Sequence, residues 1–115
     1  VEKENGRLLG DCAFWTSKDG KQAEIGITLA QKNQGQGFAS EAVRQLVDLL
    51  FVQFGLHRVY AICDVGNEGS WRLLQRLGWR KEGEFIDSYW FKGRWTSEFH
   101  FALLRREWEI ERRFS

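Results

Sequence analysis

The sequence predicts a single domain of mixed α/β class, and three observations lead to that prediction. The first third alternates apolar and polar residues between turn signals, as strands do. Residues 38–54 and 68–77 repeat apolar residues at the helical period, with a strand-like stretch between them. No repeat, low-complexity segment or proline linker divides the chain, so we expect one domain over residues 1–115.

The opening third predicts an antiparallel meander. Asn5-Gly6 is a hairpin signal before an extended segment at residues 8–15, and residues 18–21 form a second turn signal. In residues 23–29 the apolar side chains fall on alternate positions, so this strand should bury one face.

The middle of the chain predicts a crossover. Residues 38–54 should form a helix with a wide buried face that ends at Gly55. Residues 57–64 are again strand-like, rich in β-branched and aromatic side chains. Because a helix connects them, the strands at residues 23–29 and 57–64 should be parallel, with a right-handed connection.

The second half predicts one more helix and a hairpin, which makes the sheet mixed and mostly antiparallel with one parallel strand pair. Asn67 is placed to cap a helix over residues 68–77, and Gly78 follows as its end. Residues 85–91 and 95–104 predict two strands joined by a short turn.

The predicted elements share one core and leave the tail outside it. Residues 105–113 are charged on most sides and predict a short surface helix, in which Arg112 and Arg113 are balanced by glutamates. The core should bury eight apolar residues: Ile25, Ile27, Leu46, Leu50, Val59, Ile62, Leu73 and Leu77.

The composition narrows the function classes. A net charge of +1 gives no ground for nucleic-acid or membrane-surface binding. No apolar run could span a bilayer and the first residues are polar, unlike a signal peptide, so we expect a cytoplasmic protein. Cys12 and Cys63 lack metal-ligand spacing and should be reduced thiols, with a disulfide between them as the alternative. His57 and His100 should be structural, so no metal is expected.

A glycine-rich loop, Gln34-Gly35-Gln36-Gly37-Phe38-Ala39-Ser40, lies where a strand has ended and a helix begins. Glycines let successive backbone N–H groups point at one spot, and the first turn of the helix favours an anion there. A merely tight turn is the alternative. The P-loop and dinucleotide fingerprints are excluded, because Phe38 follows Gly37 and Ser40 replaces a third glycine.

The spacing Gln34-x-x-Gly37-x-Ala39 resembles the acyl-CoA signature of the GNAT superfamily of N-acetyltransferases. Further matches stand in the family's order: residues 23–26 before the loop, Asn67-x-x-Ser70 at the next helix, and Leu-Gly-Trp-Arg-Lys-Glu-Gly at residues 77–83. Trp95 and Glu107-Trp108 resemble the branch that includes ribosomal-protein N-terminal acetyltransferases. The resemblance implies that residues 1–115 are a partial domain, and we expect no counterpart in them of the first strand and two helices of full-length members.

The resemblance implies the GNAT acyl-CoA N-acyltransferase fold. It implies direct transfer of an acetyl group from acetyl-CoA to a primary amine, on a small molecule or a protein amino terminus. The pantetheine arm would lie between the strands at residues 24–30 and 59–64, and loop amides would hold the pyrophosphate. The residues expected to contact acetyl-CoA are Leu29, Gln34, Gly35, Gln36, Gly37, Phe38, Ala39, Ser40 and Asn67.

Two residues are candidates for acid–base roles, since no cysteine has a histidine nearby in sequence to suggest a covalent nucleophile. Glu24 matches the family's water-relaying glutamate; the alternative is a solvated carboxylate. Ser70 matches the serine with which some members protonate the departing thiolate; the alternative is an ordinary first-turn serine. Many members use a tyrosine four residues later, where this chain has Leu74.

The resemblance leaves a second function class open, because it covers only part of a full-length member. That alternative is a truncated, non-catalytic acyl-CoA-binding or interaction domain, and a nucleotide-binding fold is a third. A sheet without its first strand exposes an edge, which favours a homodimer. Tyr89, Trp90 and Trp95 are candidates to line an amine pocket, although core packing is the favoured interpretation.

Overall fold

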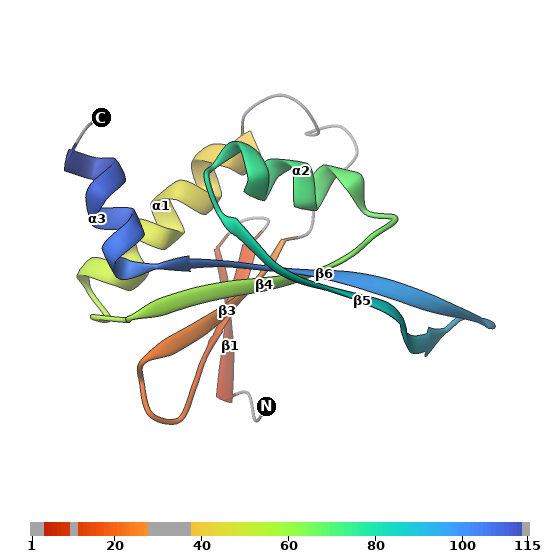
Figure 1. Cartoon of the computed structure of the whole chain (residues 1–115). Coiled ribbons are helices and arrows are strands. Elements are labelled where there is room, and N and C mark those ends of the chain that lie inside the picture. The colour runs from red at the N-terminus through yellow and green to blue at the C-terminus, as the bar shows by residue number, and fades with distance from the viewer. Residues whose placement is uncertain (1–3, 10–11, 28–37, 114–115) are drawn as a thin grey trace.

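The structure is a computed structural model that describes residues 4–9, 12–27 and 38–113 (Figure 1). The described elements form a six-stranded sheet in the order β1-β2-β3-β4-β6-β5, with three helices. In chain order they are β1 (Glu4–Leu9), β2 (Cys12–Thr16), β3 (Gln22–Ile27), α1 (Phe38–Val52), β4 (Arg58–Asp64), α2 (Glu68–Arg76), β5 (Arg80–Phe91), β6 (Arg94–Leu104) and α3 (Arg105–Arg113).

The first three strands form the antiparallel meander that the sequence predicts, but the first turn lies elsewhere. Asn5 and Gly6 are inside β1, and the chain reverses between Leu9 and Cys12. The strand register shifts between Glu4 and Arg7, so a bulge accommodates the Asn-Gly pair. Pairing along β2 therefore overrides the local turn preference of these two residues.

The predicted parallel pairing is confirmed, while the right-handed connection stays a prediction. Helix α1 lies between β3 and β4 in chain order, and the two strands pair in parallel, from Gln22 opposite Arg58 to Glu24 opposite Tyr60. On its other side β4 pairs antiparallel with β6, and this pairing extends over the whole length of β4. The sheet is thus mixed, with one parallel pair among otherwise antiparallel pairs.

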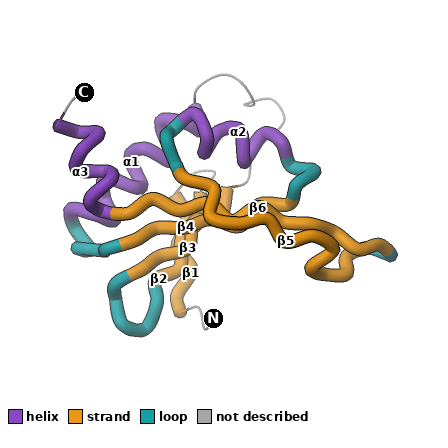
Figure 2. Tube along the Cα trace, in the orientation of Figure 1, coloured by secondary structure: helices purple, strands orange, loops and turns teal. Residues whose placement is uncertain are grey.

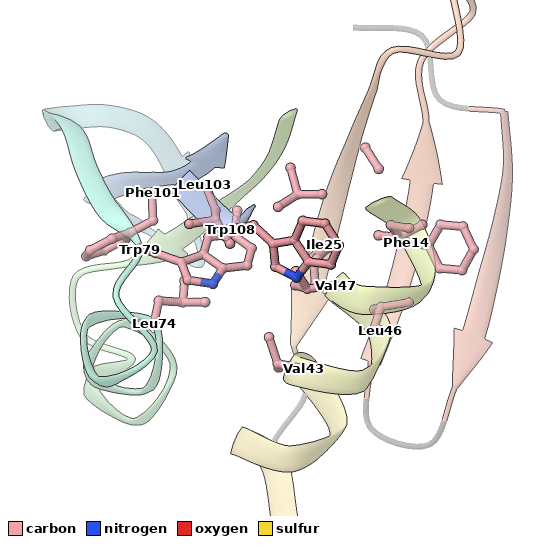
Figure 3. Close-up of a cluster of buried hydrophobic side chains, with 14 of the residues drawn as sticks. Phe14, Ile25, Val43, Leu46, Val47, Leu74, Trp79, Phe101, Leu103 and Trp108 are labelled. Atoms are coloured by element: carbon pink, nitrogen blue, oxygen red, sulfur yellow. The ribbon is translucent and has the colours of Figure 1, made fainter. Parts of the chain in front are cut away.

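All three helices lie over one face of the sheet (Figures 1 and 2). The apolar side chains between them form one core, which Figure 3 shows from Phe14 and Ile25 in the meander, through Val47 of α1, to Trp108 of α3. Strand β4 presents Val59, Ala61 and Cys63 to this core and the intervening residues to the opposite face. Among the described residues, no helix covers that opposite face.

Seven of the eight predicted core residues lie in or against this core. Ile25, Leu46, Leu50, Val59 and Leu73 are buried, and Ile27 and Leu77 are partly buried against them. Ile62 is the wrong prediction, because the alternation of β4 places it on the face without helices, where it is 38% exposed.

The β5–β6 hairpin departs from the prediction in two ways. Strand β5 begins at Arg80, well before residue 85, and the hairpin extends beyond the helical layer (Figure 1). Trp90 and Trp95, for which core packing was favoured, pair edge to face near its tip and are 61% and 56% exposed. Lys92 and Gly93 both have positive φ and form the turn.

The tail forms the expected helix, α3, but one of its side chains belongs to the core. Trp108 is buried against Phe51, and its indole N–H donates to the carboxylate of Asp48 at 2.8 Å. Arg112 also pairs with Asp48, at 3.3 Å, rather than being balanced only within its own helix. Within the described ranges, no helix is long and apolar enough to cross a membrane.

The burial pattern of α1 predicts that substitutions at two nearby positions have very different effects on the free energy of unfolding. Leu50→Ala should lower the free energy of unfolding by about 2 to 5 kcal/mol, because Leu50 is fully buried. Val52→Ala, at a 58% exposed position of the same helix, should change it by less than about 0.5 kcal/mol. Urea denaturation measures both, and equal effects would mean that the buried face of α1 is misassigned.

Candidate functional site

A small cleft opens where the two parallel strands stop pairing. Their contact ends at Glu24 opposite Tyr60, although β3 continues to Ile27 and β4 to Asp64. A cavity of about 70 Å³ lies there, with the first turn of α2 alongside. The residues that line it are Ile25, Ile27, Ala61, Ile62, Cys63, Asp64, Asn67 and Ser70.

Ser70 is the most unusual group in the cleft. Its residue is 3% exposed, and its hydroxyl has no hydrogen-bond partner among the described residues. A buried hydroxyl without a partner costs about 1 to 3 kcal/mol, so most such groups in proteins are satisfied. The fold therefore holds a proton donor at the cleft that is not used for folding contacts.

Asn67 reaches the same cavity from the start of α2. Its backbone occupies the predicted N-cap position, and its carbonyl accepts from the N–H of Ser70 at 3.2 Å. Its side chain makes no capping hydrogen bond. Asn67 therefore occupies the predicted N-cap position, but the prediction that its side chain caps the helix is wrong. The expected contact of Asn67 with acetyl-CoA stays a prediction.

The structure does not place Glu24 in the cavity. Glu24 stands at the last paired position of β3, between Trp15 on β2 and Tyr60 on β4, and it is half-buried. Its side chain lies on the opposite strand face from Ala23 and Ile25, which are in the core. Glu24 and Ser70 thus approach the end of the strand pairing from different faces of the sheet.

Most of the predicted pyrophosphate loop lies outside the described residues. Leu29, Gln34, Gly35, Gln36 and Gly37 lie outside the described residues. The remaining loop residues, Phe38, Ala39 and Ser40, form the first turn of α1, and of their side chains only that of Ser40 is described, as half-buried.

Cys63 and Asp64 line the cleft although the sequence did not single them out for this site. Cys63 is a buried free thiol, and burial raises its pKa to about 11. It is therefore protonated near neutral pH and is a poor nucleophile. Asp64 accepts hydrogen bonds from the N–H of Gly66 at 2.7 Å and the hydroxyl of Tyr89 at 3.2 Å. The position of Asp64 at the end of a parallel strand is the sequence feature that could have identified it as a site residue.

No metal site accompanies this cleft in the described ranges, where no cluster of three potential ligands occurs. His57 is exposed, and His100 stacks on Phe85 with the ring centroids 4.2 Å apart.

The chain is similar to known acetyltransferases. The family model described as "Acetyltransferase (GNAT) domain" matches residues 1–80. The uncharacterized N-acetyltransferase p20 of Bacillus licheniformis is 38% identical over 109 residues, which are 94% of this chain and 61% of that protein. The putative ribosomal N-acetyltransferase YdaF of Bacillus subtilis is 35% identical over 92 residues, 80% of this chain and 50% of YdaF.

A solved structure supports the same likeness. The crystal structure of a GNAT-family acetyltransferase from Bacillus anthracis superposes with a TM-score of 0.78 and 30% identity, over 84% of this chain and 58% of that one. The chain therefore spans about 50 to 61% of the length of these three proteins.

The burial of Cys63 predicts slow alkylation. In a Cys12→Ser variant at pH 8, the folded protein should react with iodoacetamide roughly 100-fold more slowly than the unfolded chain, whose thiol has an ordinary pKa near 9.0. Because the folded pKa is raised, the rate should keep rising up to about pH 11. Mass spectrometry of the modified fraction measures it, and a plateau near pH 9 would contradict the assignment.

Proposed function

The chain belongs to the GNAT acetyltransferase family, and from that membership we propose that it transfers an acetyl group from acetyl-CoA to a primary amine. The observation that carries the proposal is the buried hydroxyl of Ser70 at the cleft between β3 and β4, which has no hydrogen-bond partner among the described residues. Acetyl-CoA would supply the thioester, and the residues of the cleft fit it because β3 and β4 stop pairing there.

We propose direct attack rather than a covalent acetyl-enzyme. The amine nitrogen forms a bond to the carbonyl carbon while the carbon–sulfur bond breaks, and the nitrogen loses a proton. Ser70 would donate its hydroxyl proton to the departing sulfur. The raised pKa of Cys63 supports the direct route, because the thiol in the cleft is protonated at neutral pH.

Glu24 is the proposed base, acting through water. Water is needed because Glu24 is not among the residues that line the cavity and lies on the other face of the sheet. Asn67 is proposed to contact acetyl-CoA from the start of α2, where it is one of the residues that line the cleft. The loop at residues 34–40 and the backbone at Leu29 are proposed to bind the pyrophosphate and the pantetheine arm.

The acceptor is proposed to be a primary amine on a small molecule or on a protein amino terminus, in the cytoplasm. The likeness to a putative ribosomal N-acetyltransferase supports the second possibility. A homodimer is proposed through a sheet edge, which β1 and β5 provide among the described strands.

Acyl-CoA binding without turnover is the second candidate function. It is favoured by the position of Glu24, which does not line the cavity. Among the described residues that do line it, Asp64 carries the only carboxylate that could act as a base beside the proton donor Ser70. Calorimetry with CoA and acetyl-CoA tests binding, and thiol release in the presence of amines tests turnover. Absence of binding to the folded chain would contradict both candidates.

Ser70→Ala should separate catalysis from folding. Turnover should fall about 10- to 100-fold while the acetyl-CoA dissociation constant changes little, because the proton is needed only as the carbon–sulfur bond breaks. The free energy of unfolding should stay the same or rise by about 1 kcal/mol, because the lost hydroxyl has no described partner. Ser17→Ala, in the turn between β2 and β3, is the control and should leave turnover unchanged. Normal turnover by Ser70→Ala would exclude the proposed role.

Glu24→Gln should give a defect that depends on pH. A lost base matters most when the acceptor amine is protonated, so the deficit in kcat/KM should shrink as the pH rises toward the pKa of the amine. The measurement is kcat/KM of wild type and variant from pH 6.5 to 10 with one amine. A deficit of constant size at every pH would show that Glu24 is not the base.

A further inference from the structure

A second cavity, of about 340 Å³, lies between α1, α3 and the turn that joins α2 to β5. It shares no lining residue with the cleft, since α2 contributes Ser70 to the cleft and Leu77, at its other end, to this cavity. Small-molecule sites in proteins usually have volumes of about 300 to 1,000 Å³. The cavity is therefore large enough for a ligand and is separate from the site proposed for acetyl transfer.

Buried apolar side chains form the floor of the cavity. Val43 and Val47 come from one face of α1 and Leu103 from β6, while Trp79 and Trp108 add two indole rings (Figure 3). Surfaces of this kind bind the apolar part of a ligand, and indole rings favour contact with another aromatic ring. The floor therefore predicts a ligand with a large apolar group, preferably an aromatic one.

Helix α3 is fixed against α1, so the cavity is part of the folded structure. The indole N–H of Trp108 donates to Asp48 at 2.8 Å, and Arg112 pairs with the same carboxylate at 3.3 Å. At the start of α3, the guanidinium of Arg105 donates to the carbonyl of Phe51 at 2.8 Å. Because these contacts connect the two helices near both ends of α3, a ligand would find the cavity already formed.

The indole N–H of Trp79 indicates which polar group the ligand carries. Among the described residues it has no hydrogen-bond acceptor, unlike the indole N–H of Trp108, which has Asp48. Buried tryptophans usually have such a partner. Trp79 lines the cavity and is only 5% exposed, so the cavity is the route by which an acceptor reaches it. A ligand with an oxygen acceptor next to its apolar group would satisfy this donor.

The charged side chains around the cavity balance one another. Asp48 and Arg112 already form an ion pair. The other two, Arg44 of α1 and Glu111 of α3, are exposed, and within the described ranges they form no ion pair with each other. Oε2 of Glu111 lies over the α2–β5 turn, 3.7 Å from where a Cβ at Gly78 would be. A cation on one wall and an anion on another favour a ligand that carries both charges over one with a net charge.

We propose that this cavity binds a free amino acid with a large apolar side chain, such as phenylalanine. The side chain packs against the floor, between the indole rings and α1. The carboxylate accepts a hydrogen bond from the N–H of Trp79 and pairs with Arg44, and the ammonium group pairs with Glu111. The proposal is independent of the proposed acetyl transfer, because none of these three residues lines the cleft.

Calorimetry of the whole chain with L-phenylalanine tests the site. The folded wild type should bind it saturably, and should bind 3-phenylpropionate and phenethylamine at least about threefold more weakly, because each lacks one of the two charges. Trp79→Phe keeps an aromatic ring but removes the N–H, so it should weaken phenylalanine binding about tenfold. Val47→Phe places a larger side chain in the cavity and should abolish binding. Trp71→Phe, which removes an indole N–H of α2 outside the cavity, is the matched control and should bind like wild type.

Three results would overturn the proposal. The first is no saturable binding of phenylalanine by the folded wild-type chain. The second is equal affinity of wild type and folded Trp79→Phe for phenylalanine. The third is an equal or higher affinity for either analogue, which would mean that the ligand is not an amino acid. Circular dichroism on the same samples shows which variants are folded, and the comparison of the three ligands needs the wild-type chain alone.

Discussion

The parallel contact between β3 and β4 extends over only three residue pairs, and the arrangement of the cleft depends on where it stops. Up to Glu24 and Tyr60 the two strands are joined by the backbone hydrogen bonds of a parallel pair. Beyond these residues β3 and β4 continue but no longer pair with each other. Backbone groups past this point need partners from elsewhere, which β4 finds on one side only, in β6. The cleft is therefore a consequence of strand pairing, and α2 adds Ser70 and Asn67 to it because that helix begins directly after β4.

The helical layer determines which side of the cleft is accessible. Helices α1, α2 and α3 cover one face, so apolar side chains of β4 and β6 such as Val59, Phe101 and Leu103 are buried there. The opposite face keeps partly exposed residues of mixed character, including Ile62 and Asp64. The same core that stabilises the fold thus separates a covered side, with the buried hydroxyl of Ser70, from an open side that carries Asp64.

Periodicity in the sequence predicts most of the elements, because amphipathic repeats report directly on burial. It fails where position in the sheet decides the outcome. Ile62 is as apolar as its neighbours, but only the pairing of β4 fixes which face it occupies. Trp90 and Trp95 are exposed because the hairpin extends past the helices, a property that no local pattern encodes. Asn5 and Gly6 favour a turn locally and are held in a bulged strand by β2.

The sequence predicts which residues belong to the site, but it does not predict how the fold arranges them in space. Ser70 and Asn67 could be identified from a spaced motif, whereas the lack of a partner for the Ser70 hydroxyl depends on packing between a helix and two separated strands. Asp64 was missed because its place in the cleft depends on where β3 and β4 stop pairing.

The hydroxyl of Ser70, next to the end of β4, is unfavourable for folding. A buried hydroxyl without a described partner costs about 1 to 3 kcal/mol. A single substitution, alanine for Ser70, would relieve this cost without disturbing the core. Stability alone therefore does not account for a serine at this position. A ligand that supplies a hydrogen-bond acceptor in the cleft would compensate for the cost.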